Sequence, residues 1–211
     1  MVDAHQDIGV RRHCGEGFPN WYADKNLSHS CDDYIGQALW IAGECKTVED
    51  YAWRRDADGN PLLEDCQKTT FFKYYLMPES VSLFDKLYDN KEGMQDAFIE
   101  YWTVVSKRFA NNKYVVGYDP LNEPWPSTYS HDPSLFLSKG GFDDLKLKPM
   151  YKKIFERYMA ADRSKLMFFE GNPIVDAVAA VPGGLMPNGF QDLPGGNQAG
   201  QQVFNEHTYC C

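Results

Sequence analysis

The chain has 211 residues, of which 43% are hydrophobic and 15% are aromatic. This composition is typical of a globular protein, and the length suits one large domain or two small ones. The formal net charge of −9 argues against a nucleic-acid-binding protein, because no basic block is present to neutralise phosphates. No run of about eighteen apolar residues occurs, so no transmembrane segment is predicted.

The first predicted elements are a strand end at residues 1–7, MVDAHQD, and a long irregular segment at residues 8–78. A loop of that length inside a compact domain is usually functional or disordered. Aromatic residues recur along it and favour an ordered loop, and four of the six cysteines lie in it: Cys14, Cys31, Cys45 and Cys66.

The cysteine spacings lack a CxxC pair, which argues against a zinc site. We predict disulfides that staple the long loop, and therefore a secreted or lysosomal (lumenal) protein. The alternative is a set of free thiols in a cytosolic protein. A glycosylation triplet, Asn26-Leu27-Ser28, is compatible with secretion, and Cys210 and Cys211 close the chain.

Alternating helices and strands are predicted in the rest of the chain. Residues 92–110 carry one apolar stripe and form the clearest helix. A strand at 114–122 follows, and then a polar loop to about residue 146. A second helix has Pro149 near its first turn. A strand at 165–170, a Gly/Pro-rich stretch at 171–200 and a strand at 202–210 complete the chain.

This order predicts an α/β fold with parallel strands and right-handed crossovers. The short, mostly continuous apolar runs are typical of a sheet covered on both faces. A doubly wound sheet and a (β/α)8 barrel both fit the pattern. The absence of a G-x-G-x-x-G motif after any strand weakens the nucleotide-binding version.

Polar side chains gather where the predicted strands end, which is the active-site face of a parallel α/β barrel. Taken singly, each has an ordinary structural explanation as a turn, a packed pair or a loop cap, and the first group could also be a metal-ligand cluster. Four strands that all finish in polar groups are harder to explain by chance. The residues are Asp3, His5 and Asp7; Asn122 and Glu123; Glu170; and His207 and Tyr209. Glu206 is out of phase with His207 and is expected to point away.

These residue types suit glycoside hydrolysis. One carboxylic acid protonates the leaving oxygen, and in a retaining enzyme a second carboxylate about 5 Å away attacks the anomeric carbon. Asn122 is placed to hold a sugar 2-hydroxyl, and the histidines and tyrosine to position the carboxylates. Trp125, just past Glu123, could offer an aromatic face to the substrate.

The segment GYDPLNEPWP, residues 117–126, resembles the strand-four motif of glycoside hydrolase family five, specifically its endoglycoceramidase branch. DAHQD followed by CGEGFPNW resembles the strand-three segment of that branch, and HTYCC its strand-six segment. FFEGN and VPGG are similar to its spacers. The likeness touches most of the chain, although residues 28–78 match poorly. The combination is specific, whereas Asn-Glu-Pro alone would be weak.

The resemblance implies a TIM barrel that cuts oligosaccharide from ceramide with retention, without a metal or other cofactor. Glu123 matches the acid/base and Asn122 its partner amide. His5, flanked by Asp3 and Asp7, matches the strand-three histidine. His207 and Tyr209 match the strand-six pair. The implied substrate is a glycosphingolipid at a membrane surface.

The resemblance also predicts that residues 1–211 form one partial barrel domain, about half of the barrel, covering strands three to six. Its parts are the strand-three end (1–7), the loop (8–78), the strand-four site (114–126) and the strand-six end (202–211). The family nucleophile, a glutamate at the end of strand seven, is then absent from this chain. The chain alone is expected to be inactive.

Two departures and two rival functions accompany this interpretation. Pro120 lies inside the predicted strand, so a local bulge is expected. Glu170 is a poor substitute nucleophile, because a strand-five carboxylate would approach from another part of the barrel mouth. The rival enzyme is a β-glucosidase acting on glucosylceramide or sterol glucosides. The rival of another class is a non-catalytic glycolipid-binding protein.

Overall fold

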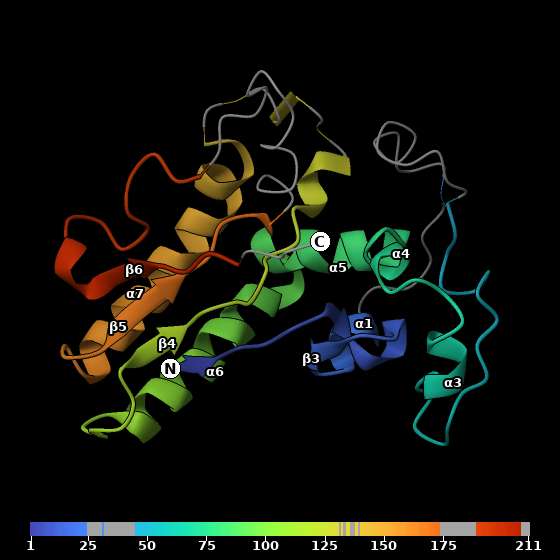
Figure 1. The fold of residues 1–211 in the computed structure, drawn as a ribbon, viewed down its shortest axis with the longest axis horizontal. Coiled ribbons are helices and arrows are strands. Elements are labelled where there is room, and N and C mark those ends of the chain that lie inside the picture. The colour runs from blue at the N-terminus through green and yellow to red at the C-terminus, as the bar shows by residue number, and fades with distance from the viewer. Residues whose placement is uncertain are drawn as a thin grey trace. The chain divides into compact units, whose positions relative to one another are not determined.

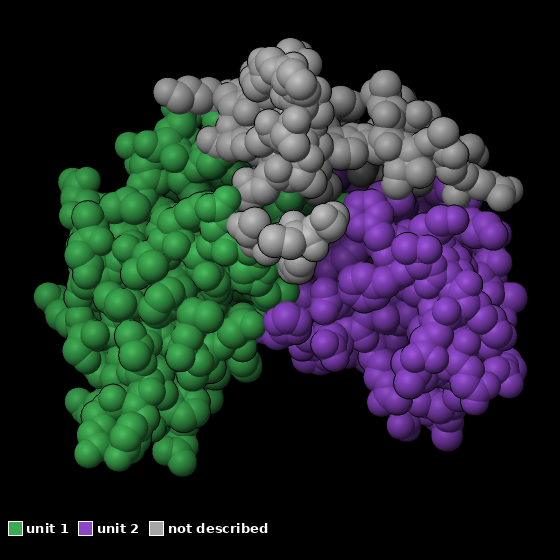
Figure 2. All heavy atoms as spheres, in the orientation of Figure 1, with its two compact units in different colours: residues 1–4, 88–126, 134–211 green, residues 5–87, 127–133 purple. Residues whose placement is uncertain are grey.

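A computed structural model describes residues 1–24, 31, 45–130, 132, 134–135, 138, 140–173 and 189–207. The chain divides into two compact units, coloured separately in Figure 2. Unit 1 contains Met1–Ala4, Tyr88–Pro126 and Ser134–Cys211, and unit 2 contains His5–Leu87 and Ser127–Pro133. The glycosylation triplet, Tyr209 and the two terminal cysteines lie outside the described residues.

Unit 1 is built on a parallel sheet with the strand order β1-β4-β5-β6 (Figure 1). Its register pairs Val2 with Tyr118, Gly117 with Leu166, and Phe169 with Phe204. The parallel pairing predicted from the alternating pattern is therefore confirmed. The strands are β1 (Val2–Asp3), β4 (Gly117–Asp119), β5 (Leu166–Phe169) and β6 (Gln202–Phe204).

The strands are shorter than predicted: β1 holds Val2–Asp3 of the predicted 1–7, and β5 holds Leu166–Phe169 of the predicted 165–170. The predicted strand at 114–122 is wrong at both ends, since β4 holds only Gly117–Asp119. Tyr114 is exposed, and its main-chain N–H donates to the Asn112 side chain at 2.9 Å, which makes a turn before the strand. The predicted strand at 202–210 ends at Phe204 within the described residues.

The carboxyl end of β4 contains one extra residue. Ala4 N–H donates to Asp119 O at 3.1 Å, and Ala4 O accepts from Asn122 N–H at 3.3 Å. In a regular parallel ladder, the N–H donated to Ala4 O would come from the residue two beyond Asp119. Here it comes from the residue three beyond, Asn122. Pro120 lies in this stretch and has no N–H to donate. The expected bulge is present, and it changes the direction in which Asn122 and Glu123 leave the strand.

The helices of unit 1 pack beside this sheet. Helix α6 (Met94–Phe109) contacts α7 (Lys148–Ala161), and α7 contacts β5. A π-helix, η6 (Asp143–Leu147), leads into α7, and two short 3-10 turns are η3 (Lys91–Gly93) and η7 (Ala199–Gln201). Both predicted helices are confirmed, with Pro149 in the first turn of α7. The fully buried aromatic side chains of this core include Trp102, Tyr118, Phe142, Tyr151, Phe155 and Tyr158.

Unit 2 contains more regular structure than the predicted irregular loop. Strands β2 (Ile8–Val10) and β3 (Glu16–Phe18) pair in parallel around η1 (Arg11–His13). Four short helical segments are α1 (Trp21–Asp24), α3 (Leu63–Cys66), α4 (Phe72–Tyr75) and η4 (Ser127–Ser130). Two disulfides, Cys14–Cys66 and Cys31–Cys45, confirm the stapled loop and overturn the free-thiol alternative for these four cysteines.

Helix α5 (Pro78–Tyr88) was not predicted. Its sequence carries an ordinary helix signal, because Pro78 is the first helical residue and Val81, Phe84 and Leu87 recur at three-residue spacing. All three of these side chains are buried. Within the described residues, no helix has the length and apolar character needed to cross a membrane.

Candidate active site

Glu123 stands at the centre of the polar groups at the carboxyl edge of the unit 1 sheet. It follows the bulge after β4, and its φ of 41° lies in the left-handed region, which non-glycine residues seldom adopt. Backbone strain of this kind persists only where surrounding contacts hold it, and it is concentrated at functional sites. The side chain is mostly buried, with 19% of its surface exposed.

His207 joins Glu123 to Glu170. The ring Nδ1 lies 2.8 Å from Glu123 Oε1, and the ring Nε2 lies 3.1 Å from Glu170 Oε1. Glu170 Oε2 in turn accepts the main-chain N–H of Glu123 at 2.7 Å. The orientation of Glu123 is therefore fixed from two sides, by a side-chain contact and by a main-chain contact.

Asp119 and Asn205 lie behind Glu170. The Asn205 Nδ2 group donates to Asp119 Oδ2 at 2.8 Å and to Glu170 Oε1 at 3.1 Å. The carboxyl groups of Asp119 and Glu170 are hydrogen-bonded to each other. A hydrogen bond between two carboxyl groups requires a proton on one of them. Asp119 is fully buried and Glu170 almost so.

Burial determines the protonation of this pair. Loss of solvation raises the pKa of Asp119 to about 8 and the pKa of Glu170 to about 7. The charge of Asp3 acts in the same direction on both groups. The Glu123 N–H opposes it at Glu170, and Asn205 opposes it at Asp119. The pair therefore keeps one proton near neutral pH, as two adjacent buried carboxylates cannot both ionise easily.

The other predicted residues of unit 1 lie near this network. Asp3 ends β1 and acts electrostatically on both Asp119 and Glu170. Asn122 is buried and directly precedes Glu123. Trp125 is also buried, with 6% of its surface exposed, and its carbonyl accepts the Tyr88 hydroxyl at 2.9 Å. Little of the Trp125 ring faces solvent, so substrate stacking on it stays a prediction.

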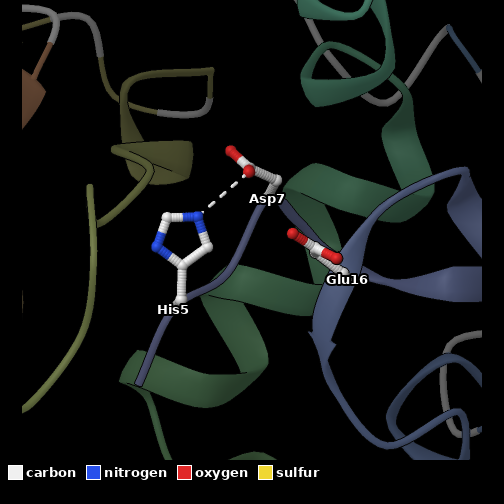
Figure 3. A group of neighbouring side chains, drawn as sticks. All are labelled: His5, Asp7 and Glu16. Atoms are coloured by element: carbon white, nitrogen blue, oxygen red, sulfur yellow. Dashed lines mark ion pairs between the residues drawn. The ribbon is translucent and has the colours of Figure 1, made fainter. Parts of the chain in front are cut away.

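His5 and Asp7 belong to unit 2, where they form a separate group with Glu16 (Figure 3). His5 Nε2 lies 3.4 Å from Asp7 Oδ2, and the Tyr75 hydroxyl donates to Asp7 Oδ1 at 3.2 Å. One ligand atom from each of His5, Asp7 and Glu16 lies within 4.8 Å of the others. The spacing would admit a cation, although exposed carboxylates often cluster without one.

Sequence reasoning did not assign three residues that the structure brings into the network: Asp119, Asn205 and Glu170. Glu170 was recognised as a strand-end carboxylate and discounted only as a nucleophile. Asn205 could have been found, since it lies two residues before His207 and side chains two apart on an extended chain share a face. Asp119 offered no such signal. Glu206 is exposed, as predicted from its phase.

Comparison with known proteins identifies the family of the chain. Residues 77–210 match the family Cellulase (glycosyl hydrolase family 5). The chain belongs to glycosyl hydrolase family 5. Over 210 residues it is 28% identical to an endoglycoceramidase of Cyanea nozakii and 27% identical to one of Hydra vulgaris. Both matches cover 99% of this chain, but only 37% and 36% of those proteins.

Solved structures show the same fold. Endo-glycoceramidase II from Rhodococcus sp., in complex with a five-membered iminocyclitol, matches 97% of this chain with a TM-score of 0.60 and 20% identity. The same enzyme in complex with ganglioside GM3 matches 88% with a TM-score of 0.55 and 19% identity. The chain spans little more than a third of these proteins. The four parallel strands are thus part of a family 5 (β/α)8 barrel.

Membership in family 5 gives the network a chemical context. A glycosidase needs one carboxylic acid that can pass a proton to the leaving oxygen and take one back from water. Glu123 is the carboxylate of this network with the most exposed side chain, because Asp119 and Glu170 are almost wholly enclosed. The arrangement can therefore present one acid to a substrate while two others stay behind it.

Proposed function

We propose that the protein containing this chain is an endoglycoceramidase-like, retaining glycoside hydrolase. It cleaves the β-glycosidic bond between the oligosaccharide and the ceramide of a glycosphingolipid, and Glu123 is its acid/base. One observation carries the proposal: Glu123 is held by both His207 and Glu170 at the carboxyl edge of the sheet. The similarity to two endoglycoceramidases along the whole chain supports the substrate class.

The mechanism begins with Glu123 protonated. Its proton passes to the glycosidic oxygen as the bond to the anomeric carbon breaks, so ceramide leaves as a neutral alcohol. Glu123 then accepts a proton from the water that releases the sugar. Asn122 is proposed to hold the 2-hydroxyl. This double displacement requires neither a metal nor a cofactor.

A second carboxylate must attack the anomeric carbon from about 5 Å away. Glu170 is not that nucleophile. Only 4% of its surface is exposed, and its two carboxylate oxygens contact the Glu123 N–H, Asn205 and His207. An attacking carboxylate must face the sugar, and Glu170 faces protein. The structure thus supports the prediction that a strand-five carboxylate is a poor nucleophile.

We also propose that the protein acts on lipid at a membrane surface, outside the cytosol. Two disulfides support a secreted or lysosomal (lumenal) location, since such bonds persist in oxidising compartments. Unit 2 carries two adjacent aromatic side chains, Phe71 and Phe72, that are 47% and 46% exposed. Neighbouring exposed aromatic rings are suited to the interface between lipid and water.

The test uses the full-length protein translated from the transcript that encodes this chain. A ganglioside, glucosylceramide and a sterol glucoside are each supplied in detergent micelles, and the released sugars are identified. We expect intact oligosaccharide from the ganglioside. Glu123→Gln should lower kcat about 10²- to 10⁴-fold without loss of folding, the range for a general acid/base. Glu206→Gln, an exposed neighbour of His207, is the matched control and should retain activity.

Three outcomes would contradict the proposal. Full activity in Glu123→Gln would show that another residue is the acid/base. Release of glucose from glucosylceramide or the sterol glucoside, with the ganglioside left intact, would favour the β-glucosidase. Binding of ganglioside micelles by the wild-type protein without any turnover would favour a glycolipid-binding protein.

A further inference from the structure

The buried carboxyl groups behind Glu123 have no part in the two-carboxylate mechanism. Asp119 and Glu170 are each at most 4% exposed, so neither can reach a substrate. Two adjacent carboxyl groups in such a place are costly, because burial disfavours the charge and only one can hold the proton between them. Their contacts, however, all lead towards Glu123.

The hydrogen bonds of Glu170 indicate that it carries the charge of the pair. Two N–H groups donate to its carboxylate, the Glu123 main chain at 2.7 Å and Asn205 at 3.1 Å, and the His207 Nε2 atom lies 3.1 Å from it. Asp119 receives the Asn205 amide at 2.8 Å and the Leu121 N–H at 3.3 Å, and it contacts Glu170 itself. Glu170 has a further nitrogen within hydrogen-bond distance, and Asp119 is the more deeply buried of the two groups, so we place the proton on Asp119.

We propose that Asp119 and Glu170 act as one positioning pair, in which the proton on Asp119 leaves Glu170 as the anion that fixes the His207 tautomer and the orientation of Glu123. The Glu170 anion requires the hydrogen of His207 to lie on Nε2. Nδ1 then faces Glu123 Oε1 as an acceptor while Glu123 holds its proton. This inference rests on the proposed function only for its catalytic consequence.

The proton balance is closed within these residues and the substrate. While Glu123 holds its proton, its hydroxyl donates to Nδ1, and the proton then passes to the leaving oxygen. Water later returns a proton to Glu123 while its oxygen bonds to the anomeric carbon, and the bond from that carbon to the nucleophile carboxylate breaks. Asp119 keeps its proton throughout, so Glu170 remains an anion and Nε2 remains protonated. No oxidant, reductant or additional reactant takes part.

Other titratable groups face the pair from the elements around it, and they bear on its pH dependence. The Tyr151 hydroxyl donates to the Glu170 carbonyl at 3.2 Å, and burial raises the pKa of this tyrosine well above its ordinary value. It therefore stays neutral throughout the working range. The groups that act on the pair are Asp3 from β1, Glu123 after β4, His207 after β6, and Tyr151 and Tyr158 from α7.

The first experiment measures kcat and KM against pH for wild type, Glu170→Gln and Asp119→Asn in the full-length protein. Glu170→Gln can still accept the Glu123 N–H but carries no charge. We expect kcat to fall about 10- to 100-fold at every pH, as for other residues that orient a catalytic group, with KM little changed. Asp119→Asn can still donate to Glu170 and imitates the protonated acid. It should retain more of kcat than Glu170→Gln does and extend activity to higher pH.

Asp143→Asn is the matched control. Asp143 is a buried carboxylate of the same unit that accepts the Asn172 N–H at 3.0 Å. It should leave the pH profile unchanged. A purely structural role would make Asp119→Asn as damaging as Glu170→Gln and would leave both pH profiles parallel to wild type. Either that result, or wild-type kcat in Glu170→Gln, would overturn the proposal.

A second measurement does not depend on activity. Nitrogen-15 NMR of histidine-labelled protein reports which ring nitrogen carries the hydrogen, and His207→Gln assigns the signal. We expect hydrogen on Nε2 in wild type and in Asp119→Asn, and a mixture of tautomers in Glu170→Gln. If this pattern holds in a protein that cleaves no glycosphingolipid, the proposed function fails and the positioning pair stands. A wild-type ring with hydrogen on Nδ1 alone would refute the pair.

Discussion

Buried carboxyl groups behave in opposite ways in the two units. In unit 1, burial raises the pKa values of Asp119 and Glu170. In unit 2, the Asp65 side chain is as well enclosed, but hydrogen bonds from Arg54 and then Lys68 hold its pKa well below its usual range. All three groups are carboxyl groups, from Asp119 and Glu170 in unit 1 and from Asp65 in unit 2. The neighbours decide whether the carboxyl group stores a proton or a charge.

The partners of each group explain the difference. Arg54 reaches Asp65 with its main-chain N–H at 2.8 Å, its Nε at 3.0 Å and its Nη2 at 3.0 Å, while most of its own side chain stays in water. The buried charge is thus compensated by a solvated cation. The pair in unit 1 has an amide, main-chain N–H groups and other acids beside it. A carboxylate that stays ionised in an ion pair suits a structural role. A pair of carboxyl groups that keeps a proton near neutral pH suits a catalytic site.

The two units are also stabilised in different ways, each by its own contacts. Unit 1 relies on a parallel sheet and a packed aromatic core. Unit 2 has short strands and helices, and its chain is closed by disulfides between residues 52 and 14 positions apart. The largest losses of stability should therefore come from a ring in unit 1 and from a cross-link in unit 2. Hydrogen exchange followed by mass spectrometry reads each unit separately.

The largest expected effect is that of Trp102→Ala. The ring is fully buried, contacts Tyr118 and Tyr158, and donates its N–H to Pro120 O at 3.0 Å. Loss of such a ring costs about 3–5 kcal/mol of unfolding free energy. Urea denaturation measures it, and hydrogen exchange should place the loss in unit 1. Trp102→Phe, which keeps most of the ring volume, should cost less. Equal loss of protection in both units would contradict separate cores.

Removal of the Cys14–Cys66 disulfide, by replacing both cysteines with alanine, should cost about 4 kcal/mol. A disulfide lowers the entropy of the unfolded chain, and this loss of entropy grows with the length of the loop that the bond closes. The Cys31–Cys45 bond closes a shorter loop, 14 positions rather than 52, and its removal should cost about 3 kcal/mol. Thermal unfolding under non-reducing conditions compares the two variants. A larger loss from the shorter loop would show that chain entropy is not the main term.

The opposite pKa shifts predict opposite responses to pH. Raised pKa values in the folded state mean that the native pair binds more protons than the unfolded chain. Its stabilisation is present below about pH 4 and is lost as the pH rises towards 7 to 8. One such proton gives a slope of about 1.4 kcal/mol per pH unit in the unfolding free energy. Asp119→Asn should flatten that slope, as measured by urea denaturation between pH 5 and 8.

Asp65 gives the other half of this comparison. Its lowered pKa means that its stabilisation is present above about pH 4 and is lost as the pH falls below that value. Asp65→Asn should therefore reduce stability at neutral pH and remove part of the acid sensitivity of unit 2. Hydrogen exchange at pH 3 and pH 6 would test this. A variant with the wild-type loss of protection at low pH would show that other carboxylates govern acid unfolding there.

The smallest expected effect concerns the start of α6. Asn90 Oδ1 accepts the Asp96 N–H at 3.0 Å, and its Nδ2 donates to Asp96 Oδ2 at 2.9 Å. Asn90 has a φ of 53°, so Asn90→Gly removes the side chain without adding backbone strain. We expect a loss of about 1 kcal/mol. Asn90→Asp keeps an acceptor for the N–H and should retain part of it. Calorimetry can resolve the two variants.

Local patterns in the sequence were sufficient for much of unit 1. The apolar stripe of α6, the proline that starts α7 and the run that becomes β5 all reflect short-range rules, and the structure confirms them. The predicted start of the strand at 114–122 is wrong for a physical reason. Residues 114–116 are apolar and mostly β-branched like a strand, but Tyr114 and Val116 are exposed, and Tyr114 lies in a turn before β4. Propensity alone cannot show whether a partner strand lies alongside.

By itself, the sequence determined the fold class and the family resemblance, and it singled out Glu123 as the candidate acid, because a motif and a periodicity are local. Only the tertiary structure decided which groups surround that acid. Asp119, Glu170 and Asn205 come from three different strand ends, and their contacts span 35 to 86 residues of chain. Register and a bulge bring them together. A protonation state depends on such long-range neighbours and on burial, neither of which a linear sequence contains.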